Sequence, residues 1–115
     1  MPGAFLRFVF NQQTFYLLKR SPIYHVDKAQ TPLLITHGKA DTRVYPGQSL
    51  ELYRHMKVRK PEVPLRLVMY PGEGHGYRGA THRYDYNLRM MRWFDTYLKG
   101  GGDMPPLSLQ KYLPE

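Results

Sequence analysis

The chain has 115 residues, 42% of them hydrophobic, and 17 Lys and Arg against 9 Asp and Glu give it a formal net charge of +8 at pH 7. This length suits one small domain with a modest core, and the lack of cysteine excludes disulfides, thiolate metal sites and a thiol nucleophile, which fits a cytoplasmic protein. No segment approaches the roughly 18 consecutive apolar residues of a membrane span, and the N-terminus lacks the pattern of a secretory signal peptide.

The first segment, residues 1–20, holds two apolar runs, residues 5–10 and 15–18, on either side of a short polar link. The runs suit a β-hairpin, but their apolar residues also fall at helical spacing, so both structures stay open. We treat this segment as a unit of unclear role. Residues 23–30 are then expected to form a loop or a short helical turn, with His25 and Asp27 as a surface pair.

A buried strand is predicted next, because residues 32–35 form a short run of large apolar side chains bounded by turn residues. The loop that follows contains Gly38 and presents Asp41 and Arg43. In open α/β sheets, ligand and catalytic groups gather at the carboxyl ends of strands, so this loop is a candidate site.

A helix is predicted over about residues 47–60, ending before Pro61, with an apolar face formed by Leu50, Tyr53 and Met56. Residues 64–70 form a second predicted strand, and the glycine-rich loop after it presents His75. A strand, a helix and a strand joined over this length indicate the right-handed crossover of a parallel sheet. Both loops then open at the same edge, so Asp41 and His75 can meet.

The last predicted element is a helix that begins near Thr81 as the N-cap. The glycines at 100–102 end it, because glycine relieves left-handed geometry at a helix C-terminus. The tail to residue 115 is expected to be extended or disordered unless packed. One face of this helix is traced by Tyr84, Leu88, Met91, Phe94 or Asp95, and Leu98.

Several of these motifs occur together in one known family. They are Ser21-Pro22-Ile23, Thr31-Pro32-Leu33-Leu34, His37-Gly38, Ala40-Asp41-Thr42-Arg43-Val44, Gln48-Ser49, Tyr70-Pro71-Gly72-Glu73-Gly74-His75-Gly76-Tyr77 and Trp93-Phe94-Asp95-Thr96-Tyr97-Leu98. From Ser21 to about Gly100, the chain resembles the C-terminal end of the catalytic domain in the prolyl oligopeptidase family of serine peptidases, an α/β-hydrolase fold. We therefore expect a partial α/β-hydrolase domain over residues 21–100, with a tail at 101–115.

The resemblance implies roles for three residues. Asp41 would be the acid and His75 the base of a Ser-His-Asp triad, and Arg43 would hold a substrate carbonyl, with a structural salt bridge as its alternative. The chemistry is consistent, because a base histidine needs a carboxylate on one ring nitrogen and a nucleophile on the other. The implied substrates are peptides or small esters and amides, and hydrolysis of this kind needs no cofactor and no metal.

The serine nucleophile is missing. Such enzymes carry it in a G-x-S-x-G turn before the acid, and Ser21, Ser49 and Ser108 all lie in other contexts. A complete α/β-hydrolase sheet also needs about twice this length. We expect a partial catalytic domain that is inactive by itself, and a non-catalytic α/β fragment or interaction module is the alternative. Because two strands leave sheet edges open, we expect a homo-oligomer, a complex with a complementary upstream segment, or aggregation.

Other ligand classes have weaker support. The glycines at 72, 74 and 76 lack dinucleotide-binding spacing, and we interpret them as residues that let His75 project from a tight loop. His75 and His82 with Glu73 do not form a helical H-x-x-x-H metal motif. The basic residues are scattered, with no block of five and no RNA-binding motif, so we expect neither nucleic acid nor a membrane as a partner.

Overall fold

The computed structural model describes residues 19–100 and 102–107. Its elements are η1, a 3-10 helix (Pro22–Lys28), strand β1 (Leu33–Gly38), helix α3 (Gly47–Arg59), strand β2 (Leu65–Tyr70) and helix α4 (Ala80–Tyr97). The short helical turn predicted after residue 22 is thus present as η1. The apolar runs before residue 19, with their open choice of hairpin or helix, lie outside the described residues, as does Ser108.

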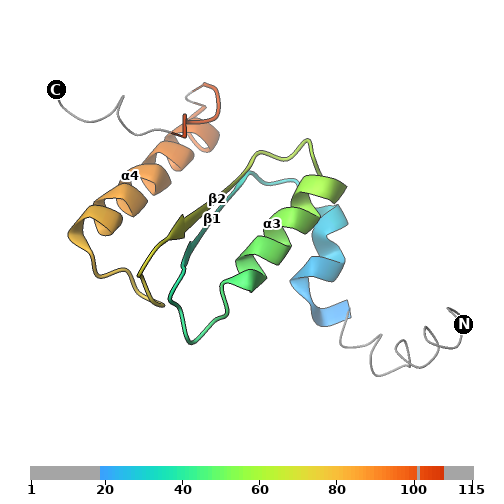
Figure 1. Ribbon diagram of the computed structural model, residues 1–115. Helices are drawn as coiled ribbons and strands as arrows, with labels where there is room; N and C mark the ends of the chain where they lie inside the picture. Colours follow the sequence, from blue (N-terminus) through green and yellow to red (C-terminus); the bar gives the residue numbers. More distant parts are fainter. Residues whose placement is uncertain (1–18, 101, 108–115) are drawn as a thin grey trace, which may run out of the picture.

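The two strands pair in parallel, from Leu33 opposite Leu65 to Gly38 opposite Tyr70, and α3 is the crossover between them. This confirms the predicted β-α-β unit with a following helix. η1 and α3 lie on one side of the sheet and α4 on the other (Figure 1). Because the strands are parallel, the loops after Gly38 and after Tyr70 leave the sheet at the same edge.

The core of the described residues lies between η1, α3 and the sheet, where Val26, Ile35, Met56, Val63 and Leu65 are buried together. Leu52 and Tyr53 of α3 pack against this cluster. The predicted face of α3 was wrong at Leu50, which is exposed. Leu52, Tyr53 and Met56 lie at the i, i+1, i+4 spacing of one helix face, and this face points to the core. Leu50 lies outside that face.

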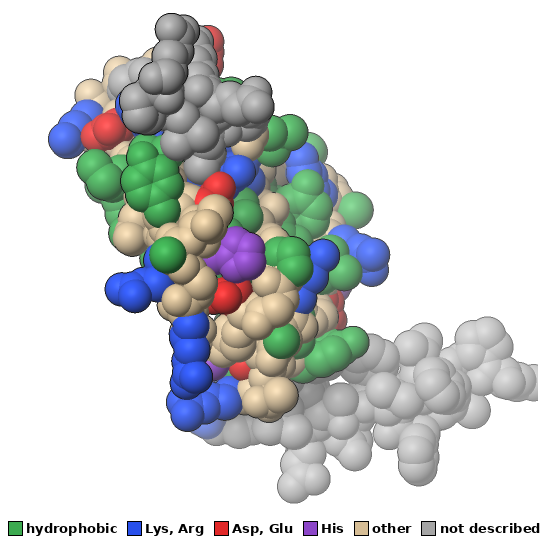
Figure 2. All heavy atoms as spheres, turned by 60° about the vertical axis from the view of Figure 1, so that its left-hand side comes forward, with side chains coloured by type: hydrophobic (Ala, Val, Ile, Leu, Met, Phe, Trp, Pro, Cys, Tyr) green, Lys and Arg blue, Asp and Glu red, His purple; other side chains and the backbone are tan. Residues whose placement is uncertain are grey.

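Helix α4 turns a different side to the sheet than its apolar stripe indicates. Trp93 is buried. Four side chains of the predicted stripe, Tyr84, Met91, Phe94 and Leu98, are between 49% and 77% exposed, and the fifth, Leu88, is half-buried. These four residues are called the α4 stripe below. The face turned forward in Figure 2, which carries α4, shows hydrophobic side chains at the surface among Lys and Arg.

Both ends of α4 follow local backbone geometry. The N-cap is Gly79, with φ −66° and ψ 131°, so the prediction of Thr81 as the cap was wrong by two residues. Thr81 lies inside the first turn because the chain already enters the helix at Ala80. Beyond the other end, Gly100 has φ +70°, the left-handed conformation that glycine adopts without strain.

Candidate active site

The loops after β1 and β2 interlock at the carboxyl edge of the sheet. Ala40 donates its backbone N–H to the carbonyl of Glu73 at 2.8 Å, and Lys39 donates to the carbonyl of Tyr70 at 2.8 Å. Gly38 makes this approach possible, since a Cβ there would lie 2.3 Å from the carbonyl oxygens of both Glu73 and Gly74. The two loops can therefore form these hydrogen bonds because residue 38 is a glycine, which has no side chain.

Asp41 is buried at this junction and accepts four N–H donors. Its Oδ1 accepts the backbone N–H groups of Arg43 and Val44 at 2.9 and 3.0 Å, and its Oδ2 accepts from His75 Nδ1 and from His37 Nε2, each at 3.1 Å. The backbone N–H of Val44, together with His75 and the N–H of Arg43, outweighs desolvation and lowers the pKa of Asp41 from 3.8 to about 2. Asp41 is therefore a fixed anion at neutral pH.

His75 lies between that buried anion and solvent. Its Nδ1 donates to Asp41 Oδ2, while its side chain is 54% exposed. Within residues 19–100 and 102–107, Nε2 has no hydrogen-bond partner. This combination, one ring nitrogen on a carboxylate and the other open, suits transfer of a proton to or from an external group.

The loop that carries His75 is anchored on both sides of the ring. Glu73 is buried and accepts the backbone N–H groups of Arg78 and Gly79 at 2.5 and 3.2 Å. Burial raises the pKa of Glu73, but those donors and His82 outweigh it and hold the pKa below its ordinary value. On the other side of His75, the Tyr77 hydroxyl donates to Thr36 Oγ1 of β1 at 3.0 Å and so ties the loop to the sheet.

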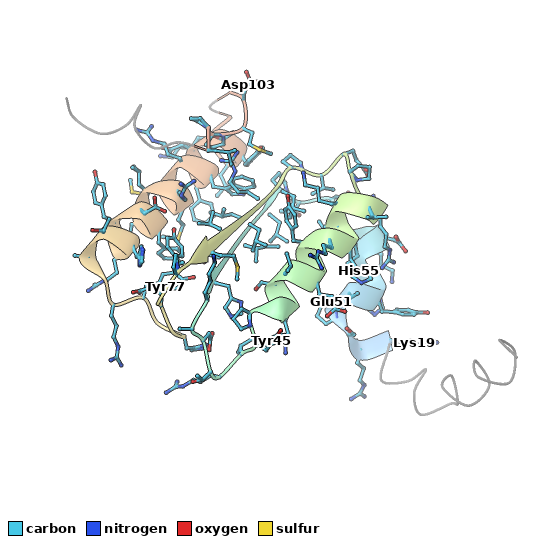
Figure 3. The ribbon with its side chains drawn as sticks, viewed as in Figure 1. Lys19, Tyr45, Glu51, His55, Tyr77 and Asp103 are labelled. Atoms are coloured by element: carbon cyan, nitrogen blue, oxygen red, sulfur yellow. The ribbon has the colours of Figure 1, made fainter. Side chains whose placement is uncertain are left out.

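Tyr77 marks the loop between β2 and α4, and Tyr45 marks the loop that leads from β1 into α3 (Figure 3). Both lie at the same end of the sheet, which agrees with the interlocked loops. Gly72 has φ +73° and needs glycine for that reason, whereas a Cβ at Gly74 or Gly76 would meet no atom within 4 Å. The interpretation that all three glycines serve the tight loop therefore holds for Gly72 only.

His37 belongs to the site although its role was not predicted. It is buried at the end of β1, and its Nδ1 lies 2.5 Å from Ser49 Oγ at the start of α3. Its Nε2 lies 3.0 Å from the carbonyl of Val44, in addition to its contact with Asp41. The available signal was a histidine four residues before Asp41, near the end of a largely apolar strand.

Arg43 and His75 line the same open groove, of about 670 Å³, together with Ala40, Thr42, Gly72, Glu73, Gly74, Gly76, Tyr77 and Arg78. Arg43 is exposed, and no carboxylate of the described residues forms an ion pair with it. The described structure therefore offers no support for the alternative of a salt bridge. Arg43 is therefore an exposed, positively charged residue of the groove that His75 also lines.

None of the serines in the described part of the chain is a hydrogen-bond partner of His75. Ser49 bonds His37, and no described serine hydroxyl forms a hydrogen bond with His75. His25 and Asp27 do not form the expected pair, since Asp27 forms an ion pair with Arg59 at 2.5 Å and His25 bonds the carbonyl of Lys19. Asp27 pairs with Arg59 and not with His25 because the guanidinium of Arg59 binds both carboxylate oxygens of Asp27.

In the described part of the chain, no three His, Asp or Glu side chains are grouped so that they could hold a metal ion. None of its helices has the length and apolar character needed to cross a membrane.

The sequence of this chain is similar to those of known proteins. A model of the prolyl oligopeptidase family matches residues 9–101, including part of the segment before residue 21. The chain is 35% identical to the acylamino-acid-releasing enzyme of Homo sapiens over 82 residues, which cover 71% of this chain and 11% of that protein. It is 33% identical to dipeptidyl-peptidase 5 of Porphyromonas endodontalis over 88 residues, 76% of this chain and 12% of that protein. The matched part thus spans about one tenth of the length of these curated relatives.

Proposed function

This chain belongs to the prolyl oligopeptidase family, and we propose that it is the C-terminal part of an α/β-hydrolase catalytic domain that supplies the Asp and His of a Ser-His-Asp triad. The observation that carries the proposal is the hydrogen bond from His75 Nδ1 to the buried Asp41, with Nε2 of His75 on the solvent side. This is the geometry that a general base needs when its nucleophile comes from elsewhere.

In the proposed reaction, a serine supplied by an upstream segment attacks the carbonyl carbon of a peptide, ester or amide. His75 Nε2 takes the serine proton and then gives it to the leaving group as the carbon–nitrogen or carbon–oxygen bond breaks. Water repeats the sequence to release the acyl group. Asp41 fixes the Nδ1–H tautomer and stabilises the imidazolium, and the oxyanion donors come from the upstream segment.

Arg43 is proposed to bind substrate. It lines the groove with His75, and its guanidinium can donate to a carbonyl oxygen of a bound peptide. The names of the relatives, an acylamino-acid-releasing enzyme and a dipeptidyl-peptidase, support peptides as the substrate class.

The thin core supports the idea that this chain works with a complementary segment. Among the described residues, no large side chain is less than 2% exposed, and the sheet has two strands with open outer edges. The α4 stripe adds apolar surface on one side. We propose that an upstream segment or a second copy covers part of this surface, and a single monodisperse monomer in sedimentation would count against it.

A second candidate function is a non-catalytic fragment or interaction module. The observation that favours it is the same exposed stripe, combined with the lack of a nucleophile motif around Ser21, Ser49 and Ser108. Under this alternative, replacing His75 changes no measurable property of the chain beyond the loss of one hydrogen bond. A cytoplasmic location stays a prediction from the cysteine-free sequence.

The test is hydrolysis of a chromogenic peptide anilide by a product extended upstream in the coding region. His75→Ala should lower kcat/KM by about 10⁴-fold or more, since losing a triad member disables the whole unit. His55→Ala is the matched control, because His55 is an exposed histidine of α3 whose partner within reach is Glu51. Equal activity of the two variants would contradict the assignment of the base.

A further inference from the structure

Two histidines share one oxygen of Asp41. His37 Nε2 and His75 Nδ1 both lie 3.1 Å from Oδ2, but their surroundings differ. The side chain of His37 is 9% exposed, whereas that of His75 is 54% exposed. Oδ2 is therefore approached by one buried, constrained ring and by one ring at the surface.

The partners of His37 determine which of its nitrogens carries the proton. The carbonyl of Val44 only accepts hydrogen bonds and lies 3.0 Å from Nε2, so Nε2 must be the N–H donor, to that carbonyl and to Asp41 together. Nδ1 faces Ser49 Oγ at 2.5 Å, and a hydroxyl can donate to it. A neutral imidazole with the proton on Nε2 therefore satisfies every contact of the ring.

The same contacts fix the ring in space from three segments. His37 is on β1, Ser49 is in the first turn of α3, and Val44 is in the loop that carries Asp41. The backbone N–H groups of Arg43 and Val44 hold the other oxygen, Oδ1. With His37 on Oδ2, the carboxylate plane has a fixed donor on each oxygen before His75 binds.

We propose that His37, held by Ser49, is a positioning residue for the catalytic pair: it fixes Oδ2 of Asp41 in the direction from which it accepts Nδ1–H of His75. This inference rests on the proposed function of Asp41 and His75. The chain of contacts runs from Ser49 through His37 and Asp41 to His75, so the start of α3 is linked to the exposed base. His37 itself moves no proton in the reaction.

The predicted signature is the tautomer of His75. In a neutral imidazole, the nitrogen that carries the proton is set by the hydrogen bonds that the ring makes. Asp41 in the right orientation favours Nδ1–H in His75, and a misdirected carboxylate removes that preference. The ¹⁵N shifts of the ring nitrogens report the tautomer, and they can be measured on the 115-residue chain at about pH 9, above the ordinary imidazole pKa of about 6.5.

Two polar substitutions of His37 form a matched pair. In His37→Gln, the side-chain amide reaches about as far as Nε2 and can still donate to Asp41 Oδ2. In His37→Asn, the shorter amide reaches only to the position of Nδ1, on the side of Ser49. The expected result is that His37→Gln keeps the excess of Nδ1–H in His75, whereas His37→Asn lowers it to the level of the exposed His55 in the same spectrum.

Ser49→Ala tests the same link without changing His37. It should lower the Nδ1–H share of His75 in a folded chain, and it serves if His37→Asn does not fold. An unchanged share in the folded variants that break the link would overturn the proposal. A wild-type chain in which His75 shows no excess of Nδ1–H over His55 would instead contradict the Asp41–His75 pair and with it the proposed function, so the two failures are distinguishable.

Discussion

A substitution at Gly38 tests the junction of the two loops that carry Asp41 and His75 most directly. In Gly38→Ala, the new Cβ would lie 2.3 Å from the carbonyl oxygens of Glu73 and Gly74, whereas an ordinary contact is 3.4 Å or more. The His75 loop must therefore retreat by about 1 Å, and both obstructing atoms are backbone, which cannot rotate away as a flexible side chain does. The retreat also stretches the hydrogen bond from Ala40 to Glu73.

We expect Gly38→Ala to lower the free energy of unfolding by about 1–3 kcal/mol, the usual cost of overpacking. It should also lower kcat/KM of an upstream-extended product by about 100-fold, because a shift of about 1 Å in a catalytic group has that effect. Urea unfolding of the 115-residue chain and hydrolysis assays of the extended product measure the two effects separately.

Gly76→Ala is the matched control, since a Cβ at Gly76 meets no atom within 4 Å and the residue lies next to His75 in the same loop. It should leave stability within about 0.5 kcal/mol of wild type. Equal stability of Gly38→Ala and wild type, or an equal loss in both variants, would refute the idea that the close approach at Gly38 holds the loops together.

Three further predictions concern the core, the carboxylate and the groove. Met56→Ala should lower the free energy of unfolding by about 2–5 kcal/mol because Met56 is buried in the core, and Val58→Ala, at an exposed position of the same helix, should change it by no more than about 0.5 kcal/mol; urea titration compares them. The pKa of Asp41 is lowered from 3.8 to about 2 in the folded chain, so the stability that it contributes is present above about pH 4 and is lost as the pH falls through about 2. Asp41→Asn should flatten the dependence of unfolding on pH in that window, and an unchanged slope would contradict the hydrogen-bonded anion. Arg43→Ala should lower kcat/KM of the extended product about 10- to 100-fold, the worth of one charge-assisted hydrogen bond, with little change in stability. A large fall in the free energy of unfolding with little change in kcat/KM would instead favour a structural role for Arg43. Arg78→Ala, which removes another arginine of the same groove, is the comparison.

The sequence was sufficient for the features that depend on local patterns. The two strands, the crossover helix and the placement of Asp41 and His75 at one edge follow from apolar runs, glycine loops and connection length. Parallel topology then brings the two loops together, whatever the details of packing. This is why the Asp41–His75 contact could be anticipated.

Details that depend on packing could not be read from one sequence. Apolar spacing along α3 and α4 does not say which side meets the sheet, so Leu50 was assigned to the wrong face and the α4 stripe lies at the surface. The start of α4 differs from the prediction because the backbone enters the helix at Ala80, after Gly79. The residue at which α4 begins depends on the loop before it, where Glu73 accepts the backbone N–H groups of Arg78 and Gly79.

The contacts of His37 also depend on packing and could not be predicted from the sequence. Its two ring nitrogens find partners on α3 and on the Asp41 loop, which lie at their observed distances only after β1 and the helix have packed. A histidine at the end of a strand, four residues before Asp41, marks a candidate site residue but does not say which groups its two ring nitrogens will bond. The clash that forbids a side chain at Gly38 likewise appears only when the two loops are in place.

The central claim is that this chain supplies Asp41 and His75 but no nucleophile to a serine hydrolase. Labelling with a fluorophosphonate probe, which reacts with an activated serine, tests it most directly on the 115-residue chain and on a product extended upstream in the coding region. Labelling of the extended product alone, and its loss in the His75→Ala variant of that product, is the result that we predict. Labelling of the 115-residue chain would contradict the claim, because one of its own serines would then be the nucleophile.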